Sequence, residues 1–216
     1  MSRSKSPGDR RPASGRGTYH HGDLRRALVE AGQEILAERG VDGLSLREVA
    51  RRAQVSQAAP YHHFADKAAL VGAIVEEGFA RFRHELLVSA DQIGGGALQR
   101  FTGMGLAYVR FAVDNPALFR LLFRPELRGR IDEGPAAAAI EQAELGAYQV
   151  LLDAAQAAID EGSVRGLSAE DVALSAWSMV HGLATLIVDG PADIGRRPPE
   201  EMARAVLFAL GAGFAG

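Results

Sequence analysis

The side chains of this sequence best suited to chemistry are its six histidines, four of which form the adjacent pairs His20-His21 and His62-His63. Adjacent residues on a helix point about 100 degrees apart, so neither pair can readily share one metal ion. The chain contains no cysteine, which excludes disulfides, thiolate metal sites and thiol nucleophiles. It also contains no His-Glu-x-x-His, no Glu-x-x-His, no phosphate-binding loop and no serine nucleophile elbow. We therefore predict no metal site, no cofactor and no enzyme activity.

A second set of candidate residues lies in the C-terminal half of the chain. Trp177 and His181 are four residues apart and share a helical face, so an indole and an imidazole can contact one ligand. Tyr108, Phe111 and Tyr148 belong to a wider group of large side chains from which helical proteins build small-molecule sites. We predict that these five residues bind an apolar or amphipathic small molecule. The alternative is an ordinary aromatic core in which the histidine is satisfied by a neighbouring carbonyl.

The elements that must position these residues are all predicted to be helices. Apolar residues recur at helical spacing, and no window alternates long enough to indicate a sheet, so the fold class is all-α. The first four helices are expected to begin near residues 23, 45, 57 and 67. The others are expected at about 97–113, 116–123, 135–161, 168–189 and 199–213, which makes about nine helices.

The second and third of these helices are connected very tightly. Ser45 begins the second helix and has Glu48 three residues later, the pattern of a capping box. Only Gln54 and Val55 separate this helix from Ser56, which can cap the third helix. Two short helices joined in this way must cross at a steep angle, which is typical of a helix-turn-helix.

The charge of the chain is unevenly distributed. Residues 1–67 carry a net charge of +4 and residues 68–216 a net charge of −7. Residues 1–19 are rich in Ser, Pro, Gly and Arg, and we predict a disordered basic arm. A basic front end on an acidic body favours a polyanionic partner at that end. A solvated charge distribution without a partner is the alternative.

The length of 216 residues, 47% of them hydrophobic, indicates one or two domains with a substantial core. No run of about 18 uninterrupted apolar residues occurs, and the first residues do not form a signal peptide, so we expect a cytoplasmic protein without a membrane partner. Beyond the basic arm we predict a DNA-binding domain at 20–80, with its helix-turn-helix at about 45–64. A ligand-binding domain follows at 81–216.

The stretch from residue 21 to residue 70 resembles the N-terminal domain of the tetracycline-repressor (TetR) family of bacterial transcription regulators. The resemblance is carried by a first helix ending in ERG, the helix SLREVA, VS at the start of the third helix, the aromatic end YHHF, and DK-x-x-L opening the fourth. The Trp-x-x-x-His-Gly at Trp177, His181 and Gly182 is similar to the motif of one subgroup of the family.

The resemblance implies a homodimer whose third helices enter the major groove of a palindromic double-stranded DNA operator. It also implies that a small-molecule effector in the C-terminal domain releases the operator, most often from a repressor, and that the last two helices form the subunit interface. Gln57 can pair with adenine, and the methyl groups of Ala58 and Ala59 can meet a thymine methyl. The residues implied to contact DNA are Thr18, Tyr19, Ser45, Ser56, Gln57, Ala58, Ala59, Tyr61, His62 and Lys67.

Two residues depart from the family pattern. Gln54 stands at a turn position where the family usually has glycine, and a left-handed backbone there would cost about 1 kcal/mol. Pro60 lies within the recognition helix, so this helix either starts later or has an irregular first turn. Two other classes of function stay open: a helical small-molecule-binding protein without DNA readout, and a helical-bundle enzyme.

Overall fold

A computed structural model describes residues 21–128, 134–190 and 197–214. Within these ranges the chain forms eight α-helices, three short 3₁₀ helices and no strand, which confirms the all-α fold. Thr18, Tyr19 and the predicted basic arm lie outside the described residues. The α-helices are α1 (His21–Arg39), α2 (Leu46–Arg52), α3 (Lys67–Gln92), α4 (Ala97–Asp114), α5 (Pro116–Phe123), α6 (Pro135–Asp160), α7 (Ala169–Asp189) and α8 (Pro199–Phe214). The 3₁₀ helices are η1 (Val41–Gly43), η2 (Ala59–His62) and η3 (Pro125–Arg128).

The segment predicted as the third α-helix is instead the 3₁₀ helix η2, and this prediction was wrong. Pro60 has no N–H to donate, and its ring crowds the preceding turn, so a regular α-helix cannot begin at Gln57. The backbone closes into tighter turns, in which the N–H of His63 donates to the carbonyl of Pro60 at 2.9 Å. The predicted side-chain cap by Ser56 is also wrong, because Ala58 precedes η2 and makes no side-chain cap.

The other helix starts follow from the residues that cap them. Ser45 Oγ accepts from the N–H of Glu48 at 3.1 Å, and Asp66 Oδ1 accepts from the N–H of Ala69 at 2.8 Å. These contacts satisfy amide groups that have no partner inside the helix. The first helix ends before Gly40, whose φ of 67° is the left-handed conformation expected of a glycine at a helix C-terminus.

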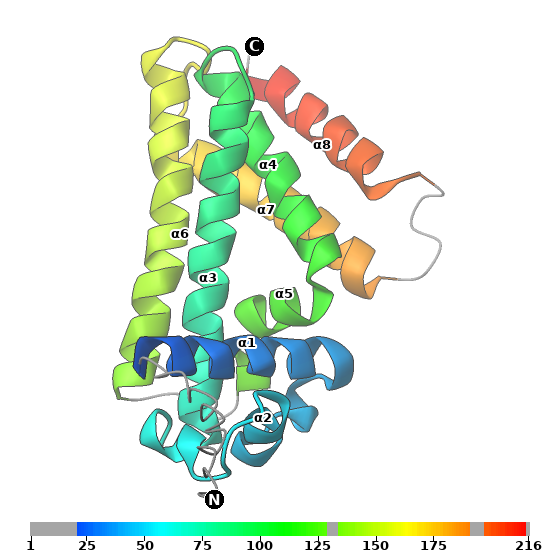
Figure 1. Cartoon of the computed structure of the whole chain (residues 1–216). Coiled ribbons are helices and arrows are strands. Elements are labelled where there is room, and N and C mark those ends of the chain that lie inside the picture. Colours follow the sequence, from blue (N-terminus) through cyan, green and yellow to red (C-terminus); the bar gives the residue numbers. More distant parts are fainter. Residues whose placement is uncertain (1–20, 129–133, 191–196, 215–216) are drawn as a thin grey trace, which may run out of the picture.

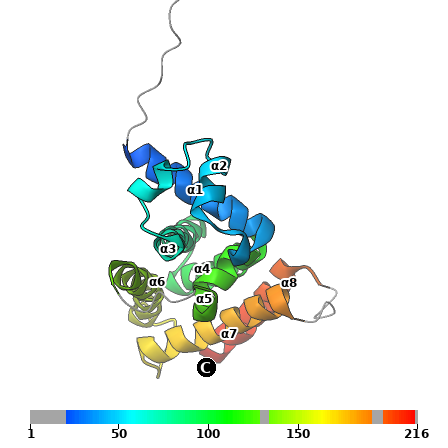
Figure 2. The same ribbon diagram turned by 90° about the horizontal axis from the view of Figure 1, so that it is seen from below.

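The helices form two connected groups (Figure 1). The short elements α1, α2 and η2 lie at one end of the molecule, and α3 runs away from that end beside α6. Helices α4 and α5 pack against α3, while α7 and α8 lie along the side of the molecule away from α1 and α2 (Figure 2). The domain boundary predicted near residue 80 falls inside α3, so this helix contributes to both groups.

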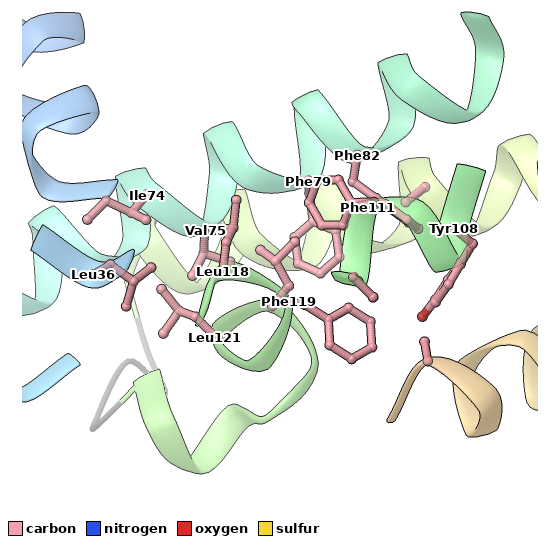
Figure 3. Close-up of a cluster of buried hydrophobic side chains, with 14 of the residues drawn as sticks. Leu36, Ile74, Val75, Phe79, Phe82, Tyr108, Phe111, Leu118, Phe119 and Leu121 are labelled. Carbon is pink, nitrogen blue, oxygen red and sulfur yellow. The ribbon is translucent and has the colours of Figure 1, made fainter. Parts of the chain in front are cut away.

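One apolar core runs through both groups without interruption. Leu36 of α1, Ile74 of α3 and Leu121 of α5 belong to it and are almost fully buried (Figure 3). Towards the other end of α3 the core becomes aromatic, because the ring of Phe82 contacts those of Tyr108 and Phe111 at centroid distances of 5.1 and 5.0 Å. These edge-on contacts are the preferred geometry of aromatic pairs.

Candidate DNA-binding face and effector cavity

The segment around η2 presents its polar side chains outward. Gln57, Ala58 and His62 are exposed, and Tyr61 is 54% exposed. Pro60 is buried beneath them, which anchors the segment to the core. The sequence-predicted recognition residues therefore lie on one short surface that a duplex can approach, although their backbone is 3₁₀ rather than α-helical.

Of the remaining predicted DNA contacts, Ser45 and Ser56 are exposed and Ala59 is half-buried. Lys67 is exposed, and its Nζ donates to the carbonyl of Val41 at 2.8 Å. The Lys67 ammonium therefore stabilises the end of η1 and still faces solvent with its other N–H groups, because an ammonium has three donors.

Two ion-pair clusters fix α2 against α1. Glu48 contacts Arg51 at 2.6 Å and Arg39 at 3.2 Å. Arg52 of α2 contacts Glu34 at 3.0 Å and Glu38 at 2.5 Å. The predicted capping box is only half formed, because the Glu48 carboxylate is engaged by arginines. The hydrogen bonds from the Arg51 guanidinium lower the pKa of Glu48 to about 2, so this carboxylate is ionised at any physiological pH.

The connection between α2 and η2 is longer than the sequence predicted, because it runs from Ala53 to Ala58 and not over Gln54 and Val55 alone. Gln54 has a φ of 56°, the left-handed conformation for which its family position usually carries glycine. The N–H of Val55 donates to the carbonyl of Ala50 at 3.0 Å, which folds the chain back on the end of α2. The turn therefore keeps its shape at the expense of local backbone strain.

Arg47 is an exposed residue of this face that sequence reasoning missed. It lies in the first turn of α2, and no ion pair of Arg47 occurs among the described residues. A cation is unfavourable at a helix N-terminus, where the helix dipole favours anions. An arginine in the first turn after a capping serine is the sequence signal that could have identified it.

The second candidate site is a cavity of about 550 Å³ in the C-terminal helical bundle. This volume lies within the range of small-molecule sites in proteins. Tyr108, Tyr148, Trp177 and His181 line it, so the structure brings together four of the five residues predicted to bind a ligand. Phe101, Met104 and Phe123, from the wider group of large side chains considered in the sequence, also line it. The apolar part of the wall that sequence reasoning missed includes Phe79, Phe82, Leu86, Leu122, Leu145, Leu151, Val180 and Leu207.

Phe111 is the predicted ligand-binding residue that the structure places elsewhere. It is 1% exposed, packs against Phe82 and does not line the cavity. Phe111 and Tyr108 are three residues apart on α4. Tyr108 lines the cavity and Phe111 does not, because different neighbours surround the two side chains. The one-dimensional pattern does not contain that information.

Three polar groups from α4 and α7 form a connected cluster in the cavity wall. Tyr108 Oη lies 2.8 Å from His181 Nδ1, and Trp177 Nε1 donates to Tyr108 Oη at 3.4 Å. The Tyr108 hydroxyl is directed towards α7 (Figure 3). Burial lowers the pKa of His181 and raises that of Tyr108. Both side chains are therefore neutral at pH 7.

The outer surface of α7 and α8 carries large apolar side chains. Leu174 and Leu186 of α7 are 54% and 48% exposed, and Phe208 of α8 is 78% exposed. Among the described residues, α7 is the one helix long and apolar enough to cross a membrane, and 28% of its most apolar window is buried. Apolar helices at subunit interfaces have the same composition. A side chain at Gly182 of α7 would meet no described atom within 4 Å.

Comparisons with known proteins agree with this architecture. Residues 28–74 match the model of the tetR family of bacterial regulatory proteins, and residues 101–210 match that of the tetracyclin repressor-like C-terminal domain. A solved structure of a protein of unknown function from Rhodococcus sp. RHA1 is 34% identical, covers 93% of this chain and 100% of its own, and superposes with a TM-score of 0.80. This chain therefore belongs to the TetR family of bacterial regulatory proteins and is a DNA-binding transcription regulator.

More distant structures share the fold. The fatty acid degradation regulator FadR from Bacillus subtilis, solved with stearoyl-CoA, is 16% identical and covers 87% of this chain and 98% of its own, with a TM-score of 0.69. AibR, solved with isovaleryl coenzyme A and operator DNA, is 21% identical and covers 89% and 98%, with a TM-score of 0.65. At these identities the likeness concerns the fold alone.

Proposed function

We propose that this regulator is a homodimeric repressor that binds a palindromic operator and is released by a small apolar or amphipathic effector in the C-terminal cavity. The observation that carries the proposal is the exposure of Gln57, Ala58, Tyr61 and His62 on a surface anchored by buried Pro60. These residues follow α2 and the sharp turn at Gln54, which is the place of the recognition segment in a helix-turn-helix. As a regulator it acts where the chromosome lies, in the cytoplasm, and binds its effector without converting it.

In this proposal Gln57 and Ala58 contact base edges in the major groove, where an amide pairs with adenine and a methyl group meets thymine. Tyr61 and His62 contact phosphates, which position the protein without reading sequence. Thr18, Tyr19, Ser45, Ser56, Ala59 and Lys67 are the further contacts carried by the family resemblance. To these we add Arg47, whose exposed guanidinium suits a phosphate.

The apolar surface of α7 and α8 is the proposed subunit interface. A monomer would expose Leu174, Leu186 and Phe208 to water, whereas a second copy packed against them would bury all three. Gly182 has open space around it within the subunit, which leaves room for a partner helix to approach closely. A two-fold dimer then carries two recognition segments, as a palindromic operator requires.

Helix α5 is the proposed connection between the effector and the DNA. Leu122 and Phe123 of α5 line the cavity, and the same helix packs against α1 of the DNA-binding group. Arg120 contacts Asp189, at the end of α7, at 2.6 Å, and Arg124 contacts the same carboxylate. A ligand that displaces α5 therefore acts on α1 and on the helix that carries the subunit interface.

The operator test compares the wild type with the double variant Gln57→Ala and Tyr61→Ala on promoter DNA next to the protein's own gene. We expect the double variant to lose at least tenfold in affinity by fluorescence anisotropy, because one bidentate base contact alone contributes about 1–3 kcal/mol. Gln142→Ala, an exposed substitution on α6, is the matched control and keeps full affinity. Equal binding by wild type and double variant would favour a helical ligand-binding protein without DNA readout.

The interface test uses Phe208→Glu, which places a charge at the most exposed apolar side chain. We expect light scattering to give the mass of a dimer for the wild type and of a monomer for this variant, with unchanged helical content by circular dichroism. Leu87→Glu is the matched control, because Leu87 is an exposed leucine of α3, outside α7 and α8. A dimeric Phe208→Glu variant would place the interface elsewhere.

A further inference from the structure

The charges in the cavity wall bear on which ligands it accepts. Arg128 is the one basic side chain among the described lining residues, and its side chain is 10% exposed. Its Nη1 contacts Glu144 Oε1 at 2.7 Å, its Nε donates to the carbonyl of Leu121 at 3.0 Å, and its Nη2 donates to the carbonyl of Leu122. Three of its five N–H groups are engaged, and the charge of Arg128 is already paired with that of Glu144.

The wall also holds an acidic side chain without such compensation. Glu141 lines the cavity, is exposed, and forms no ion pair within the described part of the chain. With Arg128, Glu141 and Glu144 the formal charge of the described wall is one negative. A carboxylate or phosphate entering here would lose part of its water without gaining an unpaired cation from the described wall, which is unfavourable.

The cluster of Tyr108, Trp177 and His181 in the cavity wall offers an uncharged hydrogen-bond donor. Tyr108 Oη accepts from Trp177, and the imidazole nitrogen of His181 is the acceptor within reach of the Tyr108 proton. If the phenol donates to Nδ1, the neutral imidazole carries its hydrogen on Nε2. Among the described residues none accepts from Nε2 of His181, and His181 is itself a residue of the cavity wall.

We propose that the cavity selects an uncharged amphipathic molecule, which places an apolar body among the aromatic side chains and a carbonyl or similar acceptor against Nε2–H of His181, and that it rejects fatty carboxylates and their coenzyme A thioesters. The inference rests on the proposed effector site and specifies the chemistry of its ligand. It also separates this chain from FadR and AibR, whose structures hold coenzyme A thioesters. Such ligands carry several phosphate charges, and the one arginine of the described wall is already paired with Glu144.

The test uses the fluorescence of Trp177, the only tryptophan in the chain and a residue of the cavity wall. Methyl octanoate, octanoate and octanoyl-CoA have the same chain and differ in charge. We expect titration of the wild-type dimer to show saturable binding of methyl octanoate, and at least 100-fold weaker binding of octanoate and octanoyl-CoA. Equal or tighter binding of either anion, or no binding of methyl octanoate, overturns the inference.

A charge-reversal variant tests the electrostatic part. Glu141→Lys supplies a cation at the exposed position of the wall, and we expect octanoate binding to tighten at least tenfold. Asp153→Lys makes the same change of charge on an exposed position of α6 outside the cavity wall, and we expect it to leave octanoate binding as weak as in the wild type. Identical gains in both variants would show that net charge, rather than the wall, decides.

The hydrogen-bond part is tested with His181→Phe, which keeps an aromatic ring and removes the donor. We expect methyl octanoate to bind three- to tenfold more weakly, since one neutral hydrogen bond is worth about this much. Butylbenzene, which has no carbonyl acceptor, should bind both forms equally; an equal loss for both ligands would assign His181 a packing role. These titrations need no DNA, so failure of operator binding and failure of ligand selection are observed separately.

Discussion

The two candidate sites differ in how the chain holds them. Around η2, polar side chains face solvent and the frame is made of arginine and glutamate contacts between α1 and α2. The C-terminal cavity is lined mainly by apolar side chains, with one partly exposed ion pair and three connected polar groups. A face that meets phosphates needs exposed donors, whereas a site for an amphipathic molecule needs a dry wall with few hydrogen-bond groups. The comparison shows that charged side chains hold the candidate DNA-binding face in place, whereas apolar side chains form most of the C-terminal cavity.

The largest expected effect is a difference in salt sensitivity between the two sites. A regulator that neutralises 6–10 phosphates loses about 10³- to 10⁵-fold in operator affinity between 50 and 200 mM salt. Binding of an uncharged ligand such as methyl octanoate should change less than about twofold, because no counterions are released. Fluorescence anisotropy measures the operator affinity and Trp177 fluorescence the ligand affinity over the same series of salt concentrations. An operator affinity that does not change with salt would contradict the prediction.

The next effect compares an aromatic side chain from each region. Phe111→Ala removes a ring that is 1% exposed and should lower the free energy of unfolding by about 3–5 kcal/mol. Tyr61→Ala removes a ring that is 54% exposed and should change it by less than about 0.5 kcal/mol. Chemical denaturation of both variants tests the prediction, and a large loss in the Tyr61 variant would mean that this side chain supports the fold.

A smaller effect is expected from the two left-handed residues that frame α2. Gly40→Ala should lower the free energy of unfolding by about 1 kcal/mol, because the backbone there has a φ of 67° while a Cβ would meet no described atom within 4 Å. Gln54→Gly should have the opposite sign and raise it by less than about 1 kcal/mol. Denaturation curves of the two variants measure the free energy of unfolding, and both substitutions are expected to change backbone strain rather than packing. Changes of the same sign in the two variants would refute the strain argument.

The smallest effect is the change in stability when the ion pairs of Glu48 are exposed to acid. The pKa of Glu48 is about 2 in the folded protein, below its ordinary value of 4.5, so its ion pairs stabilise the fold above pH 4.5. That contribution declines as the pH falls below 4.5 towards 2. Melting temperatures of the wild type and Glu48→Gln should differ at pH 6 and converge at low pH, whereas a constant difference would indicate a packing effect of the substitution.

Local signals in the sequence predicted most of the fold. Ser45 and Asp66 satisfy the first amide groups of α2 and α3, Gly40 ends α1, and each of these effects acts over only a few residues. The departure at Pro60 was visible in the sequence, but its result, a 3₁₀ turn instead of an α-helix, depends on how the chain continues into Phe64 and the core.

The candidate cavity was predictable only in part. Trp177 and His181 could be paired because they are four residues apart on one helix. Tyr108 completes their cluster from 73 residues away from His181, and the ties of Arg128 to Leu121 and Glu144 likewise join separate helices. Such contacts depend on the packing of helices against one another, which periodicity does not encode.

Helix α3 has a mechanical consequence for any response of the subunit. It begins at Lys67, next to the candidate DNA-binding face, and is 26 residues long. Phe79, Phe82 and Leu86 of the same helix belong to the cavity wall. At 1.5 Å per residue this is a rod of about 39 Å without an internal joint. A tilt of about 5 degrees imposed at one end moves the other by about 3 Å, about a quarter of the roughly 12 Å major-groove width of DNA. A small change of packing around a ligand can therefore displace the DNA-binding end of α3 far enough to disturb its fit to the duplex.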